Sequence, residues 1–216
     1  MKNGEGPLYH IWGSSSNNMY FIGNNGTIVY YDGENFKKIS GVPNFEYYCI
    51  DGIEDPDIYG ERIWVGFLNS GPERGGLIFY NGLEWQTLWS NDIQFFSDPV
   101  YRTVGSIWTT PEEKWVVFYT GGHTDGIITI HNQEYFRDYH IQKKNQGGFI
   151  RSIDGNDVND FFAVGDFNNV VHYNGKTFKY YPELSGHSRY VSVSQKGNIV
   201  YIANMSGAII YKGIRN

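Results

Sequence analysis

Nine residues in three stretches of the sequence combine charges, an imidazole and aromatic rings, as ligand-binding surfaces do. Aromatic rings bury the apolar faces of a sugar or peptide, and polar groups set its orientation. Carboxylates such as Glu73, Asp92 and Asp125 would serve glycoside hydrolysis if two of them stood about 5–10 Å apart across the bond. The nine candidates are Asn69, Glu73, Arg74, Trp89, Asp92, Phe95, Phe96, His123 and Asp125.

Three arginines form a second candidate group. Arg151 and Arg189 take the same position in successive sequence units, two residues before an apolar anchor. Arg102 comes near the start of the first expected strand of the unit before them. Planar guanidinium groups suit carboxylates and phosphates, so these side chains could converge on an anion. Salt bridges between neighbouring units are the simpler interpretation.

The acidic stretch Asp154–Asp160 raises the question of a calcium site, because calcium takes several oxygen ligands. It lacks the spacing and terminal Glu of an EF-hand loop, and Asp and Asn side chains also satisfy turn backbones, so a turn is favoured. No zinc-protease, CxxC, GxSxG or phosphate-loop pattern occurs, and the six histidines show no metal-ligand spacing. We therefore expect no metal and no cofactor, and we name no catalytic residue.

Composition and charge exclude several classes of protein. The net charge of −6 argues against a nucleic-acid partner, which would need a basic surface. Cys49 is the single cysteine, so no internal disulfide can form, and its apolar surroundings favour a core position. No apolar run approaches the roughly 20 residues of a membrane helix, and the first residues do not have a signal-peptide pattern.

An internal repeat sets the framework that must position these residues. Residues 9–36 align without a gap with residues 151–178, and eight positions of that window are identical. Apolar anchors recur at Ile11, Ile50, Ile107, Ile153 and Val191, at steps of 39, 57, 46 and 38 residues. Periods of roughly 40–50 are typical of propeller blades with four strands each.

We therefore predict an all-β fold in one domain, a β-propeller of about five four-stranded blades. The units span about 9–45, 46–98, 99–145, 146–184 and 185–216. In the first unit, strands are expected around Ile11, at 19–22 and at 27–31, followed by a two-residue Asp32-Gly33 turn and a last strand that begins at an aromatic, Phe36. The strand-opening aromatic is expected to pack between neighbouring blades, and essentially no helix is expected.

The last unit stops after its third strand. Either the ring closes with an incomplete fifth blade, or the chain is the C-terminal part of a larger ring, and we favour the larger ring.

Three insertions relative to the minimal unit carry the nine ligand-binding candidates. Six extra residues lie in 67–76, three lie in 120–126, and the connector from Trp85 to Ile107 is longer than its counterpart. In a four-stranded meander these segments leave the blades on one face, and loops on a rigid scaffold often carry function. The simpler alternative is loop drift without function.

The motifs at residues 11–15, 21–28, 31–33, 159–165 and 172–175 resemble a recurrent repeat of exported, often lipid-anchored bacterial β-propeller proteins of unknown role. Some of these proteins are loosely labelled glucosyl hydrolases. The resemblance covers about residues 9–213 and implies an extracellular or cell-envelope location. It brings no settled catalytic residues.

These observations favour a non-catalytic ligand-binding or scaffold propeller that recognises a glycan or a protein through loops of the second and third units. A glycan-active hydrolase or lyase is the alternative. A protein-interaction platform would instead expose an apolar patch larger than a few hundred Å².

Overall fold

The computed structural model describes most of the chain, in eleven stretches. For residues 89, 90, 103 and 115–140 within these stretches, the backbone alone is described. The described residues are 6–55, 57, 60–68, 75–90, 103–110, 115–121, 126–131, 134–140, 150–184, 189–205 and 207–215.

The described residues form five antiparallel sheets, and each sheet is built from strands that follow one another along the chain. Four sheets have four strands, and the fifth has three. Each strand pairs with its neighbours in sequence as a meander, which is how a propeller blade is built. The predicted all-β fold with an incomplete last unit is confirmed, and the sheets are numbered as blades in chain order.

The strands of the first two blades are β1 (Leu8–Ser15), β2 (Asn18–Gly23), β3 (Thr27–Tyr31), β4 (Phe36–Lys38), β5 (Glu46–Asp55), β6 (Gly60–Leu68), β7 (Gly75–Tyr80) and β8 (Trp85–Ser90). Those of the third and fourth blades are β9 (Thr103–Thr109), β10 (Trp115–Gly121), β11 (Gly126–His131), β12 (Glu134–His140), β13 (Ile150–Asp157), β14 (Asp160–Gly165), β15 (Val170–Tyr173) and β16 (Phe178–Tyr180). The fifth blade has β17 (Tyr190–Lys196), β18 (Ile199–Asn204) and β19 (Ile209–Ile214). A single 3-10 turn, η1 (Pro182–Leu184), is the helical element within the described stretches.

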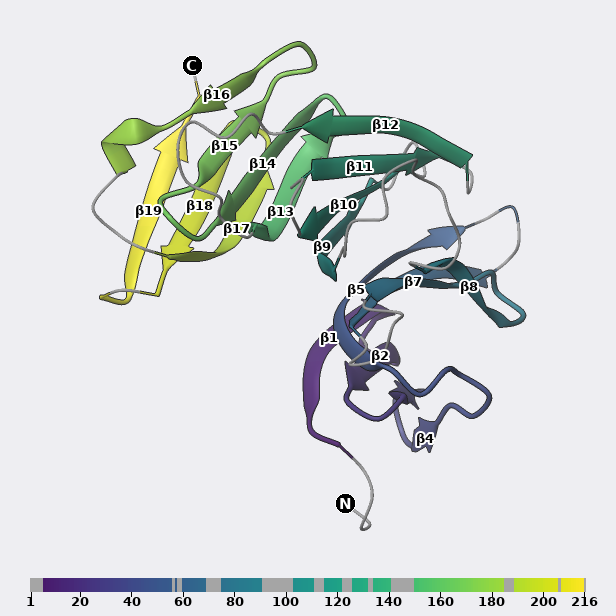
Figure 1. Ribbon diagram of the computed structural model, residues 1–216. Coiled ribbons are helices and arrows are strands. Elements are labelled where there is room, and N and C mark those ends of the chain that lie inside the picture. Colours follow the sequence, from purple (N-terminus) through teal and green to yellow (C-terminus); the bar gives the residue numbers. More distant parts are fainter. Residues whose placement is uncertain are drawn as a thin grey trace.

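The blades follow one another along an open arc, with the first blade at one end and the fifth at the other (Figure 1). Successive blades touch through their first strands: β1 contacts β5, β5 contacts β9, β9 contacts β13, and β13 contacts β17. β1 and β19 lie at opposite ends of the arc (Figure 1). The first strands therefore form a continuous row that joins the blades.

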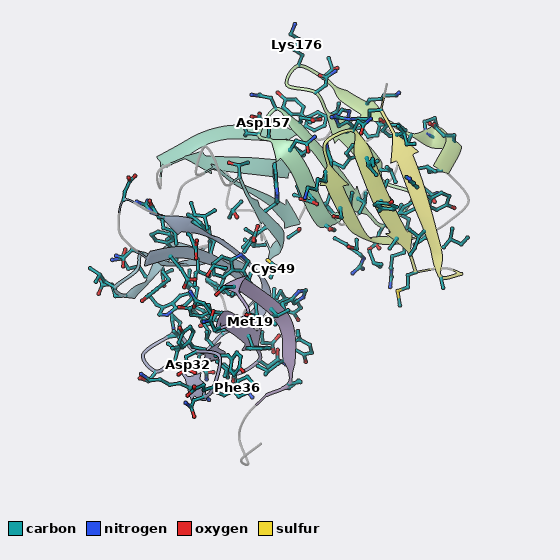
Figure 2. All side chains as sticks on the ribbon, turned by 180° about the vertical axis from the view of Figure 1, so that it is seen from behind. Met19, Asp32, Phe36, Cys49, Asp157 and Lys176 are labelled. Atoms are coloured by element: carbon teal, nitrogen blue, oxygen red, sulfur yellow. The ribbon has the colours of Figure 1, made fainter. Side chains whose placement is uncertain are left out.

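The hairpins before β4, β8 and β16 differ from the two-residue turns that the sequence predicts. Tyr31 pairs with Phe36, so four residues form the loop. The Asp32 carboxylate accepts hydrogen bonds from the backbone N–H groups of residues 34 and 35, at 2.9 and 2.7 Å. Asn81 and Asn174 do the same in their own blades, because an Asp or Asn side chain can replace a backbone acceptor in a turn. Asp32 and Phe36 lie together at this end of the first blade (Figure 2).

Apolar side chains fill the space between successive blades, because alternate residues of a strand point to opposite faces of a sheet. In the fourth blade, Phe161 and Tyr173 pack with Trp108 of the third blade. Phe162, on the opposite face, packs with Val200 of the fifth blade. Cys49 is buried in the corresponding cluster between the second and third blades, as expected from its apolar surroundings.

A hydrogen bond between first strands recurs beside these apolar clusters. The Ser106 hydroxyl accepts from the backbone N–H of Ile153 at 3.1 Å, and the Ser152 hydroxyl accepts from the backbone N–H of Val193 at 3.2 Å. The pairing registers place Ser106 and Ser152 at equivalent positions of their blades, and likewise Ile153 and Val193. Each of these serines thus satisfies an amide on the next blade, which would be costly to bury unpaired.

Two aspartates, at another shared position of the first strands, make the same kind of contact. Asp51 accepts from the backbone N–H of Thr109 at 2.7 Å, and Asp154 accepts from the backbone N–H of Gln195 at 2.8 Å. We call the contacts of Asp51, Ser106, Ser152 and Asp154 the first-strand hydrogen bonds. They fix the third, fourth and fifth blades, each against the blade before it.

Replacing Phe161 with Ala should strongly destabilise the fold. The ring is fully buried, so its removal leaves a cavity between the third and fourth blades. We expect the free energy of unfolding in a urea titration to fall by about 3–5 kcal/mol. Leu83, which is 90% exposed, is the matched control, and Leu83→Ala should change stability by less than about 0.5 kcal/mol. Equal effects of the two substitutions would contradict this packing.

Candidate functional site

Most of the residues that the sequence suggests for ligand binding lie outside the described residues. Trp89 belongs to β8, where its backbone pairs with Leu77, and nothing further is described of its side chain. Arg151 and Arg189 are described in full. The predicted residues outside the described stretches are Asn69, Glu73, Arg74, Asp92, Phe95, Phe96, Arg102, His123 and Asp125.

The strand ends that hold these loops are described, and within each blade they pair with one another. Leu68 pairs with Gly75 at the two ends of the 69–74 segment, and Ser90, where the long connector begins, pairs with the adjacent Gly76. In the third blade, Thr103 at the end of that connector pairs with Gly121, beside the 122–125 segment. Each end of the connector therefore lies beside a strand end that holds one of the other two insertions. The gathering of the three insertions on one face stays a prediction.

Arg151 and Arg189 converge on one carboxylate, that of Asp166. Arg151 makes a two-point contact through Nε and Nη2, at 2.7 and 2.9 Å, and the Nε of Arg189 lies 3.0 Å from Oδ1. Burial alone would raise the pKa of Asp166, but the two guanidinium groups hold that pKa below its usual range. The pair therefore ties the fourth blade to the fifth. Binding of an external anion there stays a prediction.

The two arginines do not share a position, contrary to the sequence alignment. Ile153 pairs with Ala163 and Val193 pairs with Ile202, so Val193 is the equivalent of Ile153, where the sequence alignment uses Val191. A slip of two residues keeps the same alternation of faces along a strand, so the apolar pattern cannot reveal it. Arg151 lies within β13, whereas Arg189 precedes β17 and forms an isolated bridge with Asp166.

Asp160 is the centre of a second charged cluster between the fourth and fifth blades. Its carboxylate accepts from both terminal nitrogens of Arg215, with Nη2 at 2.7 Å from Oδ2, and lies 2.7 Å from Nε2 of His172. Asn156 and Gln195 also donate to Oδ2, at 2.8 and 3.2 Å. Burial opposes ionisation, yet hydrogen bonds from Arg215 and His172 hold the pKa of Asp160 well below its usual range.

The acidic stretch 154–160 is therefore used within the fold. Asp157 accepts from the backbone N–H of Asn159 at 2.7 Å, which is the turn contact favoured by the sequence. Asp154 and Asp160 bind groups on the fifth blade. Within the described residues, no three His, Cys, Asp or Glu side chains gather as metal ligands would. The part of the chain that the structure describes contains no helix long and apolar enough to cross a membrane.

Burial strongly perturbs the Asp51 carboxyl. Its removal from solvent raises the pKa to about 7, and the charge of Asp154 acts in the same direction, while hydrogen bonds from Thr109 and Gly52 oppose the rise. The Thr109 hydroxyl lies 3.0 Å from Oδ2 of Asp51 and 2.9 Å from the carbonyl oxygen of Gly52. One hydroxyl proton serves one acceptor fully, so a protonated Asp51 that donates to Thr109 completes the network.

A cavity of about 250 Å³, which the sequence does not predict, lies between the fourth and fifth blades. Its walls are mainly apolar and come from β14, β15, β18, β19 and the segment that follows β16. The signal in the sequence is Gly213, which stands where Tyr31, Tyr80 and Tyr173 stand in other blades, as the pairing registers show. The cavity walls include Phe162, Tyr181, Leu184, Val200, Tyr211 and Gly213.

Comparison with known proteins supports the fold and leaves the family open. No protein-family model matches the chain, and no curated protein sequence matches it. A solved structure of Ycf48, described as bound to a D1 peptide, matches the whole chain with a TM-score of 0.69 at 10% identity. The Dos1 propeller matches 95% of the chain with a TM-score of 0.66, also at 10% identity. The chain is a β-propeller.

A third match to this propeller is a catalytically inactive virginiamycin B lyase from Staphylococcus aureus with quinupristin. It covers 99% of the chain with a TM-score of 0.61 at 15% identity. The chain spans 67%, 55% and 72% of the lengths of these three proteins, in the order given. Identities this low establish the shared fold alone.

The raised pKa of Asp51 makes the free energy of unfolding depend on pH, and the direction of that dependence follows from the shift. A folded-state pKa raised to about 7 means that the folded protein holds a proton that the unfolded chain releases near pH 4. This contribution to stability is present at low pH and is lost as the pH rises from about 4 to about 7.

We expect the Asp51 carboxyl signal in a carbon-13 NMR titration to have its midpoint near 7. In urea titrations at several pH values, wild type should lose stability relative to Asp51→Asn as the pH rises through this window. A difference in stability that is independent of pH would contradict the assignment.

Proposed function

We propose that this propeller is a non-catalytic binding scaffold. The proposal rests on the carboxylates that lie between neighbouring blades in the described part of the chain. Each of them is bound by groups that the fold itself supplies. Glu61 on the second blade accepts from Ser14 and Asn18 on the first. The remaining four are Asp51, Asp154, Asp160 and Asp166, whose contacts are described above.

A carboxylate that acts as a general acid or base needs access to substrate and a partner at the correct distance. Here the acids bind backbone amides, side-chain donors or guanidinium groups of the adjacent blade, so their hydrogen bonds hold the blades together. The lyase shares this fold, and so does Ycf48, whose structure is described as bound to a peptide, which means that the fold is compatible with either kind of function. Because these acids hold the blades together, we favour a binding function over a catalytic one.

The proposed ligand is a glycan or a polypeptide, recognised by the loops of the second and third blades. One end of the long connector lies beside the strand ends that hold the 69–74 segment, and the other end lies beside Gly121, which supports the proposal that these loops share a region of the surface. Their sequences combine Trp89 with charged groups such as Arg74 and Asp125. The proposal includes a place at the cell envelope, which is supported by the resemblance of the repeat to exported bacterial propeller proteins.

The test is a screen of the labelled, folded chain against a glycan array and a peptide array. We expect selective binding to one ligand class. Simultaneous replacement of Arg74, Trp89 and His123 with Ala should weaken that binding at least about tenfold, because a few anchor residues dominate most interfaces. The matched control replaces Lys37, Leu83 and Lys176, which are exposed on hairpins, with Ala and should leave affinity unchanged.

Two results would contradict the proposal. Cleavage of a bound glycan at a rate abolished by replacing Glu73, Asp92 or Asp125 would show an enzyme. Unchanged affinity of the triple variant for the selected ligand would place recognition elsewhere on the propeller.

A further inference from the structure

The turn between β14 and β15 in the fourth blade carries an aromatic residue in a left-handed conformation. The backbone N–H of Asn169 donates to the carbonyl oxygen of Asp166 at 3.2 Å, which closes the turn. The two residues between them, Phe167 and Asn168, have φ values of 53° and 61°. Turns with two positive φ values favour Asn, Asp and Gly, and a bulky side chain rarely adopts this conformation. Phe167 therefore strains the backbone of the turn.

The first blade has the same turn with residues that suit it. The backbone N–H of Thr27 donates to the carbonyl oxygen of Asn24 at 3.2 Å, and Asn25 and Gly26 between them have φ values of 57° and 61°. Asn25 is the counterpart of Phe167 in the aligned repeat. Since the fold accepts an asparagine at this position, the turn does not require the phenylalanine.

Packing does not explain the phenylalanine either. The Phe167 side chain is 57% exposed, and it belongs to none of the four apolar clusters that the described residues form. Strained residues gather at binding sites in many proteins, where function compensates for their cost in stability. The exposed ring on a strained turn therefore indicates contact with another molecule.

An exposed methionine of the fifth blade lies on a segment joined to this turn. Asp166 forms an isolated antiparallel bridge with Arg189, and the carbonyl oxygen of Arg189 accepts from the backbone N–H of Met205 at 3.0 Å. The Met205 side chain is 64% exposed, and its sulfur lies 3.9 Å from Nη1 of Arg189. Methionine adapts its shape to varied apolar partners and is common on binding surfaces. Two exposed apolar side chains thus come from the segments that Arg189 joins.

Arg189 supplies a positive charge to the same surface. Arg151 already contacts both oxygens of Asp166, whereas Arg189 reaches one of them through Nε. One guanidinium group in a two-point contact satisfies a carboxylate, so the second guanidinium group can serve another. The Arg189 side chain is exposed, and among the described residues its Nη2 has no hydrogen-bond partner. The surface is therefore complementary to a carboxylate.

We propose that Phe167, Met205 and Arg189 form a binding site for an acidic segment of a partner polypeptide. A carboxylate of that segment pairs with Arg189, and an apolar side chain next to it packs against Phe167 and Met205. The hydroxyl groups of a sugar would need acceptors as well as donors, whereas these three side chains offer a guanidinium group and two apolar surfaces. This combination fits an Asp or Glu side chain that is followed or preceded by a Leu, Met or Phe side chain.

This site goes beyond the proposed function, because it uses no residue from the loops of the second and third blades. The two proposals fail separately, since different variants test them. Loss of binding in the Arg74, Trp89 and His123 variant concerns the loops alone, and the variants below concern the fourth and fifth blades alone.

The experiment measures binding of the labelled full chain to an array of octapeptides in a Gly-Ser background. Each peptide carries pairs of one acidic residue, Asp or Glu, and one apolar residue, Leu, Met or Phe. In two matched series, Asn or Gln replaces the acidic residue, or Ala replaces the apolar one. We expect the acidic and apolar pairs to bind at least about tenfold more tightly than either matched series, because each matched series lacks one of the two contacts.

Phe167→Asn separates a role in binding from a role in the fold. The variant should bind the peptides at least about tenfold more weakly. Its thermal unfolding midpoint should rise by about 2–4 °C, because asparagine relieves the strain of the turn. Arg189→Gln should bind acidic and amide peptides equally. Leu83→Asn, which replaces an exposed leucine on a hairpin of the second blade, is the matched control and should leave affinity unchanged.

The proposal is overturned if no peptide binds, or if the acidic peptides bind no better than their amide counterparts. It is also overturned if folded Phe167→Asn binds the peptides as wild type does, or if its unfolding midpoint falls, which would show that the ring serves the fold. Binding of a glycan that Phe167→Asn abolishes, without binding of any peptide, would assign the surface to a glycan instead.

Discussion

The arrangement of the blades depends on hydrogen bonds that cross from one first strand to the next. A first strand is paired on one edge alone by its own blade, so the amides that face the preceding blade need partners there. Asp51, Ser106, Ser152 and Asp154 supply these partners at two repeated positions. Apolar packing is non-directional, whereas these contacts fix the positions of the second to fifth blades along the row. The repeat therefore encodes the contact between blades as well as each blade.

The same constraint explains why the described charges serve the fold. Asp166 and Asp160 bring guanidinium groups of the fifth blade onto the fourth, through Arg189 and Arg215. The Asp51 carboxyl, at an equivalent position to that of Asp154, has a pKa raised by burial. A perturbed acid often marks an active site, but structural networks perturb acids as well. Here the contacts are those of a structural network, and the insertions carried by the second and third blades are the place that we propose for recognition.

The sequence predicts much of the fold because its signals are local and repeated. Alternating apolar residues and the turn residues Asp32 and Asn174 predict the strands. The match of residues 9–36 to residues 151–178 predicts the blades. Other features need the structure. The register of Val193 is hidden because a two-residue slip preserves alternation. The four-residue hairpins depend on side-chain capping by Asp32. The partners of Asp160 come from distant segments, since Arg215 follows the last strand, and the cavity arises from the absence of a side chain at Gly213.

The central claim is that the first-strand hydrogen bonds join the blades into one cooperative unit. Native-state hydrogen exchange of the backbone amides of Thr109 and Ile153, which donate to Asp51 and Ser106, tests it most directly. We predict that both amides exchange only through global unfolding, with the same free energy as the most protected amides of the blades. Exchange through local opening, at a free energy well below that of global unfolding, would contradict it.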